Sequence, residues 1–94
     1  MGLVFEWDPR KARTNRVKHR VTFEEASSVF ADALSLTIAD PLHSGRDEER
    51  YVTIGTSHRE RVLVVVHRDR ADCIRIIGAR KATRRERRLY EEGE

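Results

Sequence analysis

The chain has 94 residues, enough for one small domain with a thin hydrophobic core, so residues 1–94 are expected to form a single domain and a second domain is excluded. Hydrophobic residues make up 38% and charged residues 37% of the chain, and their regular spacing favours a folded domain over a disordered tail. The net charge is only +3, but Lys and Arg are concentrated at positions 10–20 and 80–88, which predicts a polyanion or an acidic protein as partner, or a merely solvated surface.

Nothing in the chain indicates export or a membrane. The start "MGLVFEWD" has no basic segment followed by an apolar run, and no stretch approaches the roughly 20 apolar residues of a membrane span. A cytoplasmic location is therefore expected. Cys73 is the single cysteine, which excludes an intrachain disulfide, and it is expected to be a buried core thiol rather than a nucleophile.

The stretch "WDPRKARTNRVKH" predicts a first helix, because Asp8 suits the N-cap and Pro9 suits the first helical position. Apolar residues are few in it, so the helix should lie on the surface. Four polar residues share one side of this helix at helical spacing: Lys11, Asn15, Lys18 and His19.

A second helix is predicted to follow at once in "VTFEEASSVFADAL". Thr22 and Glu25 form the capping-box pattern that marks a helix start. The apolar face of this helix, which should contact the core, consists of Phe23, Ala26, Val29, Phe30 and Ala33.

The period then changes from helical to extended, and the strand candidates are residues 34–39, 50–55, 61–68 and 73–79. Short polar turns between the last three imply antiparallel neighbours. The apolar run from Val62 to Val66 is typical of a central strand buried on both faces. Gly78 marks a bulge, a close backbone approach or a packing position.

Thr83 and Glu86 repeat the capping-box pattern and predict a last helix in "TRRERRLYEE". The expected fold class is α+β, with a short N-terminal strand, two N-terminal helices, an antiparallel sheet of three to four strands and a C-terminal helix.

The motifs disfavour most hydrolytic chemistry. The four histidines show no i, i+4 pair and the carboxylates form no cluster, so neither a metal nor a cofactor is expected. No serine elbow or glycine-rich phosphate loop is present. What remains is phosphate binding by Arg and Lys. RNA carries its own nucleophile, the 2′-hydroxyl, so a base, an acid and positive charge are sufficient to cleave it.

In such a site Lys18 and His19 can transfer protons or hold charge, and Arg80 can bind a phosphate through its planar guanidinium. The alternative for His19 is a solvated surface group. Arg50 either faces the substrate or pairs with Glu48 or Glu49.

Other candidates have structural explanations. His67 alternates with apolar residues and is interpreted as a satisfied histidine at the core edge. Glu86 has a sufficient role in its cap, and Trp7 and Tyr90 can stack on bases but more often belong to a core. Strand order predicts two separate groups at opposite ends of the sheet: Arg50, His67 and Arg75 at one end, and Arg61 and Arg80 at the other.

The ordered series "FEWDPRKARTNRVKH", "TFEEASSVF", "ERYVTIG" and "IRIIGARKATRRERRLY" resembles the BrnT family of toxins from bacterial type II toxin–antitoxin pairs. The resemblance implies a RelE-like fold and a metal-independent endoribonuclease that blocks translation. It also implies a BrnA-like ribbon-helix-helix antitoxin, a complex of two toxins with two antitoxins, and DNA binding only through the antitoxin.

Carried over by position, the resemblance implies the catalytic residues Lys18, His19, Arg50 and Arg80. The basic residues expected to bind RNA are Lys11, Arg68, Lys81 and Arg84. The chain departs from the family at Gly78, where Ser is more usual, which puts a hydroxyl role there in doubt. The alternative function is a non-catalytic module that binds nucleic acid or protein with the same basic surface.

Overall fold

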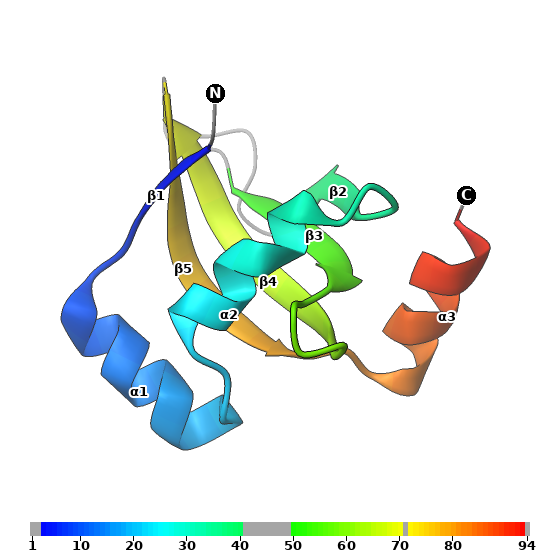
Figure 1. The fold of residues 1–94 in the computed structure, drawn as a ribbon, viewed down its shortest axis with the longest axis horizontal. Helices are drawn as coiled ribbons and strands as arrows, with labels where there is room; N and C mark the ends of the chain where they lie inside the picture. Colours follow the sequence, from blue (N-terminus) through cyan, green and yellow to red (C-terminus); the bar gives the residue numbers. More distant parts are fainter. Residues whose placement is uncertain (1–2, 41–49, 71, 94) are drawn as a thin grey trace.

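The computed structural model describes residues 3–40, 50–70 and 72–93, which form a mixed sheet flanked by helices (Figure 1). The elements in chain order are β1 (Val4–Glu6), α1 (Pro9–His19), α2 (Phe23–Ser28), the 3-10 helix η1 (Val29–Ala31), β2 (Leu36–Ala39), β3 (Tyr51–Thr56), β4 (Val62–Arg70), β5 (Cys73–Lys81) and α3 (Arg84–Glu92). These elements confirm the predicted α+β class.

The sheet has five strands in the order β1-β5-β4-β3-β2. Four of them, β2 to β5, match the predicted antiparallel sheet of three to four strands, but the whole sheet is larger than predicted. The difference is β1, which pairs in parallel with β5 and places Val4 opposite Cys73 and Glu6 opposite Arg75. The β2·β3, β3·β4 and β4·β5 pairs are antiparallel, as the short turns predicted. A three-residue strand carries too little periodicity to reveal its partner from sequence.

The first helix begins and ends at residues with clear local causes. The Asp8 side chain accepts a 2.8 Å hydrogen bond from the backbone N–H of Arg10, and Pro9 is the first helical residue, as predicted. At the other end Arg20 adopts a left-handed conformation with φ 60°, and its N–H donates to the carbonyl of Arg16. The chain therefore turns sharply from α1 into α2.

The second helix is shorter than predicted and only half of its capping box forms. Thr22 Oγ1 accepts from the N–H of Glu25 at 3.0 Å, but the Glu25 carboxylate binds Ser57 and Arg61 on the β3–β4 side of the molecule. The α-helix ends at Ser28 and tightens into η1, so Ala33 lies beyond it and is exposed. Tertiary contacts thus replace a local cap.

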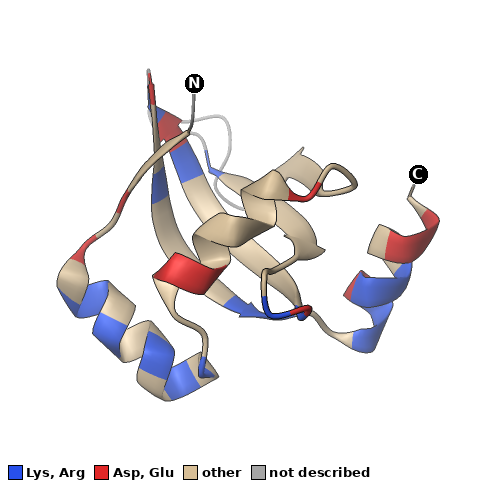
Figure 2. Cartoon of the chain, viewed as in Figure 1, with Lys and Arg blue, Asp and Glu red and all other residues tan. Residues whose placement is uncertain are grey.

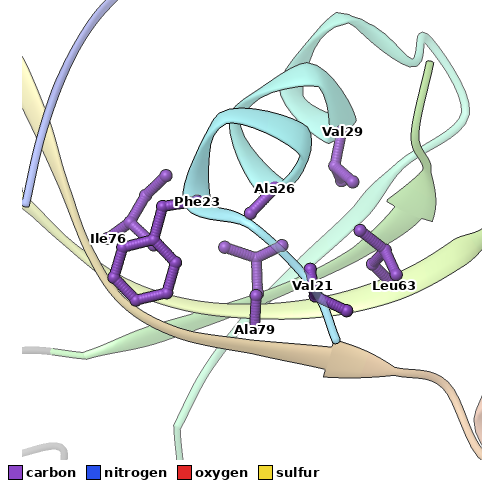
Figure 3. Packing of buried hydrophobic residues seen from close by; sticks show 8 residues of the cluster. Val21, Phe23, Ala26, Val29, Leu63, Ile76 and Ala79 are labelled. Carbon is purple, nitrogen blue, oxygen red and sulfur yellow. The ribbon is translucent and has the colours of Figure 1, made fainter. Parts of the chain in front are cut away.

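The hydrophobic core lies between α2 and the centre of the sheet (Figure 3). Its buried residues are Val21, Phe23, Ala26, Val29, Leu63, Val65, Ile76 and Ala79. Leu63, Val64 and Val65 are all buried, which confirms that β4 is covered on both faces. Leu63 and Val65 face α2, whereas Val64 faces the opposite side.

The last helix packs from that opposite side and begins as predicted. Both arms of its capping box are present: Thr83 Oγ1 accepts from the N–H of Glu86, and the Glu86 carboxylate accepts from the N–H of Thr83. Near the end of the helix, Tyr90 donates a 2.5 Å hydrogen bond to Asp32 and lies 3.0 Å from Thr56 on β3. Figure 1 shows α1 and α3 far apart, on either side of the sheet.

A register shift interrupts the β4–β5 ladder beside Gly78. Val66 pairs with Gly78, but the next residue, His67, pairs with Ile76, so Ile77 is bulged. The register shift confirms the prediction that Gly78 marks a bulge. It also turns Ile77 toward α1, where it lines the candidate site.

Candidate nucleic-acid interface

Lys11, Lys18 and His19 share one wall of a hollow between α1 and β5. The hollow has a volume of about 310 Å³ and is lined by Arg10, Lys11, Thr14, Asn15, Lys18, His19 and Ile77. Figure 2 shows the repeated positive charge along α1. Helical spacing therefore brings together three of the predicted site residues, as expected. The hollow can accept an anionic group beside an imidazole.

Arg80 on β5 and Glu86 on α3 form a bidentate salt bridge. The Arg80 guanidinium nitrogens Nη1 and Nη2 each donate to a Glu86 carboxylate oxygen at 2.8 Å. These bonds lower the pKa of Glu86 to about 2, and they raise the pKa of Arg80. A phosphate that binds Arg80 must share the guanidinium with Glu86 or displace that carboxylate.

Lys81 and Arg84 follow Arg80 at the β5–α3 junction, and both are exposed. Further arginines continue this basic surface along α3, visible as blue segments in Figure 2: Arg85, Arg87 and Arg88. The end of β5 and the start of α3 thus present a second basic surface, distinct from the wall of α1.

Arg50 and Arg68 lie side by side at the far end of the sheet. Tyr51 pairs with His67, so Arg50, which directly precedes Tyr51, comes beside Arg68, and Arg68 pairs in turn with Arg75. Arg75 contacts Glu6 at 3.3 Å. The alternative pairing of Arg50 with Glu48 or Glu49 lies outside the described residues.

The register separates these arginines from Arg80, which pairs with Val64 near the other end of β4. This confirms the predicted division into Arg50, His67 and Arg75 at one end and Arg61 and Arg80 at the other. One phosphate cannot reach both groups, whereas an extended chain of phosphates can.

His67 is a buried histidine, as predicted. Its Nε2 lies 2.8 Å from Thr53 Oγ1, and its Nδ1 lies 2.8 Å from an oxygen of Asp69. Burial lowers the pKa of His67, against the opposing effect of Asp69. Thr53 in turn contacts Thr37 at 2.7 Å, so a chain of side-chain hydrogen bonds crosses three strands. Sequence reasoning missed this chain because its members pair only after the strands align.

A second cluster that the sequence did not reveal surrounds Glu25. This carboxylate is 2% exposed, and it accepts two hydrogen bonds from the Arg61 guanidinium and one of 2.6 Å from Ser57. The bonds from Arg61 lower the pKa of Glu25. Arg61 Nη2 also donates to the carbonyl of Arg20 at 3.1 Å. The cluster therefore fixes the end of α1, directly after His19.

The remaining candidates have structural positions. Trp7 packs edge-on against Phe23 with ring centroids 5.9 Å apart, and the Tyr90 hydroxyl binds Asp32, so both aromatics support the fold. Cys73 begins β5 and is half-buried, which corrects the expectation of a core thiol: β1 covers only the edge of the sheet there. Partial desolvation and Glu6 raise the pKa of this thiol.

In the described residues, no three His, Cys, Asp or Glu side chains come together in a way that could hold a metal ion. None of the helices in the described part of the chain has the length and hydropathy needed to cross a lipid bilayer.

Fold and surface together define a small α+β protein that presents cationic side chains on a helix and along a mixed sheet. The crystal structure of the Brucella abortus ribonuclease toxin BrnT is similar in fold, with a TM-score of 0.63 and 19% sequence identity over 88% of this chain and 100% of that chain. The sequence profile described as "Ribonuclease toxin, BrnT, of type II toxin-antitoxin system" matches residues 7–86. The chain therefore belongs to the BrnT family of ribonuclease toxins, as the resemblance implied. A search of curated proteins gave no match.

Proposed function

We propose that this protein is an endoribonuclease that cleaves RNA without a metal ion and thereby inhibits translation. The observation that carries the proposal is the hollow beside α1, where His19 shares a wall with Lys11 and Lys18 in a chain of the ribonuclease toxin family. A positioned imidazole can accept the proton of the RNA 2′-hydroxyl, and adjacent ammonium groups can stabilise the charge that develops on the phosphate.

In this mechanism the 2′-oxygen attacks the adjacent phosphorus, the bond to the 5′-oxygen breaks, and a cyclic phosphate and a free 5′-hydroxyl result. His19 or Lys18 accepts the 2′-hydroxyl proton and the other group returns a proton to the leaving oxygen. Arg80, on the second basic surface, binds a neighbouring phosphate of the same RNA chain with its guanidinium once Glu86 yields part of its hydrogen bonding, and so helps to hold the reacting phosphate at the hollow.

The distribution of the other basic residues supports an extended RNA chain as substrate. Arg50 and Arg68 lie at one end of the sheet and Arg80 at the other, and Lys81 and Arg84 follow Arg80. In the proposal Arg50 contributes positive charge near the phosphates that adjoin the reacting one. Arg68, Lys81 and Arg84 bind other phosphates of the RNA backbone. Such contacts position the substrate without reading its sequence and weaken as salt increases.

The partner in this proposal is a BrnA-like ribbon-helix-helix antitoxin that forms a complex of two toxins and two antitoxins in the cytoplasm. Membership in a type II toxin–antitoxin family supports a protein antitoxin. An acidic segment of the antitoxin that covers Lys11, Lys18 and Arg80 would inhibit cleavage by occupying the site. DNA is contacted through the antitoxin only.

The test is incubation of the purified protein with a defined RNA in EDTA, beside His19→Ala, Arg80→Ala and the matched control His58→Ala. His58 is exposed on the β3–β4 turn, away from the hollow. The proposal expects cleavage by the wild type and by the control, and cleavage slowed about 100-fold or more in both site variants. Full cleavage by both site variants would remove those residues from the mechanism.

A non-catalytic binding module is the second candidate, and one observation favours it. Glu86 already binds the Arg80 guanidinium through two 2.8 Å hydrogen bonds, which suits an arginine whose charge stays paired until a polyanion competes for it. In that case the wild type would bind RNA in a salt-dependent manner and leave every phosphodiester bond intact. Electrophoresis of the recovered RNA distinguishes the two functions.

A further inference from the structure

The basic helix α1 has almost no apolar surface with which to dock. Its only buried residue is Asn15, and Val17 is 80% exposed. Ala12 is the one hydrophobic residue of α1 that packs against the core cluster. Burial of a single methyl group contributes about 1 kcal/mol at most. The position of α1 must therefore depend on polar contacts.

Asn15 provides these contacts at the open edge of β5. Its Nδ2 donates to the carbonyl of Ala79 at 2.8 Å, and its Oδ1 accepts from the N–H of Ala79 at 3.1 Å. β1 pairs with β5 only as far as Arg75, so Ala79 lies on a free stretch of the edge. The carboxamide takes the two backbone groups that a neighbouring strand would otherwise pair.

The same amide also holds the turn after α1. The second hydrogen of Asn15 Nδ2 is donated to the carbonyl of Val21 at 3.0 Å. Two carbonyl partners and one N–H partner determine the orientation of the carboxamide, because only the NH2 group can serve both carbonyls. One buried side chain thus joins α1, the turn into α2 and β5.

The residues that follow Asn15 and Ala79 in the chain belong to the proposed site. Ala79 directly precedes Arg80 in β5, and Lys18 and His19 follow Asn15 by one helical turn on the same side of α1. Any shift of the Asn15 amide relative to Ala79 changes the separation between the His19 imidazole and the strand that carries Arg80.

We propose that Asn15 is a positioning residue for RNA cleavage: its reciprocal hydrogen bonds with Ala79 set the location of Lys18 and His19 relative to Arg80. This inference rests on the proposed ribonuclease function. Asn15 itself takes no part in proton transfer. A misplacement of catalytic groups by about 1 Å can reduce a reaction rate about 100-fold. The Asn15 amide can therefore control the rate of cleavage through the positions of Lys18 and His19.

The first experiment compares Asn15→Ala with the control Val17→Ala, which truncates an exposed side chain of the same helix. Single-turnover cleavage and the binding of a 2′-deoxy RNA that cannot be cleaved are measured for both. Asn15→Ala is expected to lower the cleavage rate at least about tenfold while the binding affinity changes less than about threefold. Val17→Ala should match the wild type. An unchanged rate in Asn15→Ala overturns the inference.

A double-mutant cycle separates positioning from general destabilisation. If Asn15 acts by placing the imidazole, Asn15→Ala should cost little further activity in a His19→Ala background. A purely structural role would lower the residual rate by the same factor in both backgrounds, and that result overturns the inference.

Asn15→Asp adds a signature in the pH profile. The ionised carboxylate would face two carbonyl oxygens, whereas the protonated acid can donate to one of them and still accept from the N–H of Ala79. The activity of Asn15→Asp relative to the wild type should therefore rise as the pH falls. A constant ratio across pH contradicts the role of the amide hydrogens.

Hydrogen exchange tests the inference independently of cleavage. In Asn15→Ala the backbone N–H of Ala79 loses its acceptor, so it should exchange faster, as should the amides of α1, while the centre of β4 stays protected. Unchanged protection of Ala79 overturns the inference even if the wild type proves to cleave no RNA. An inactive wild type with faster exchange in the variant would instead contradict the proposed function.

Discussion

Arg80 is held by the same carboxylate that caps α3: Glu86 accepts two 2.8 Å hydrogen bonds from the Arg80 guanidinium and one of 2.9 Å from the N–H of Thr83. The side chains of Arg80 and Glu86 are 41% and 27% exposed, so solvent reaches the pair. A phosphate can therefore compete for Arg80, but only against a bound carboxylate. The local cap and the candidate phosphate contact are one structural unit.

Glu86→Gln should tighten RNA binding. Gln retains the side-chain acceptor of the capping box but loses the charge that pairs with Arg80, which leaves the guanidinium more available to phosphate. The stability loss should be about 1 kcal/mol or less because the pair is partly solvated. Titration of a 2′-deoxy RNA measures the affinity. Glu92→Gln, at the end of α3, changes the net charge equally and should bind RNA more weakly than Glu86→Gln does.

The same variant has a predictable dependence on pH. The pKa of Glu86 falls from 4.5 to about 2 in the folded protein because of its hydrogen bonds with Arg80. A carboxyl with a lowered pKa stabilises the fold above its unfolded pKa and loses that contribution as the pH falls through the folded value. The stability difference between wild type and Glu86→Gln should hold above pH 4.5 and vanish toward pH 2. A difference that persists at pH 2 would show that charge pairing is not its origin.

Local signals in the sequence predicted the helix starts and the shared side of α1. Asp8 and Thr83 cap helices within three residues of themselves, so the pattern that indicates the cap contains all of the participants. The helical repeat likewise determines that Lys11, Lys18 and His19 line one hollow. Short-range geometry made these features predictable.

Long-range contacts were not predictable in this way. Asn15 binds Ala79 across 64 positions in the chain, and Glu25 gives up the second arm of its capping box for Arg61, 36 positions later. Neither partner is visible until the sheet is assembled. The sequence pattern shows which groups can form hydrogen bonds, whereas tertiary structure decides which of the available partners they take.

Acid should destabilise the fold through His67. Burial lowers the pKa of this imidazole below its ordinary 6.5, so the unfolded chain binds more protons than the folded chain does just below that pH. Stability should therefore be fully present above pH 6.5 and decline as the pH falls. Urea unfolding between pH 5.5 and 7.5, values chosen to span roughly one unit on either side of the histidine pKa, measures this.

Asp69→Asn provides the control, because Asp69 is the partner that raises the pKa of His67. Loss of the Asp69 carboxylate should lower the pKa of His67 further. The free energy of unfolding should then continue to fall to a lower pH than it does in the wild type. A flat profile in the wild type would contradict the burial effect on His67.

Arg61→Ala should destabilise the protein by about 3 kcal/mol, because it leaves the Glu25 carboxylate buried without its cation. The same change removes the hydrogen bond to the carbonyl of Arg20 at the end of α1. Arg59→Ala is the matched control: Arg59 is 64% exposed and lies 3.9 Å from Glu25, so its loss should cost less than about 1 kcal/mol. Thermal or urea unfolding of both variants at neutral pH measures the difference.

An added side chain should change the stability of the protein little at Gly78 and reduce it at Gly55. A Cβ on Gly78 would meet only Asn15 Oδ1, at 3.8 Å, which is an ordinary contact, so Gly78→Ser should fold with stability within about 0.5 kcal/mol of the wild type. A Cβ on Gly55 would lie 2.8 Å from Val29 Cγ1 and 3.0 Å from Ser35 Cβ, so Gly55→Ala must displace packed groups and should cost about 1–3 kcal/mol. Urea unfolding compares the two. Equal losses would mean that backbone freedom, rather than space, determines both positions. A loss in Gly55→Ala alone would show that Ser at position 78 is compatible with this fold, so that its hydroxyl can be tested for an effect on cleavage.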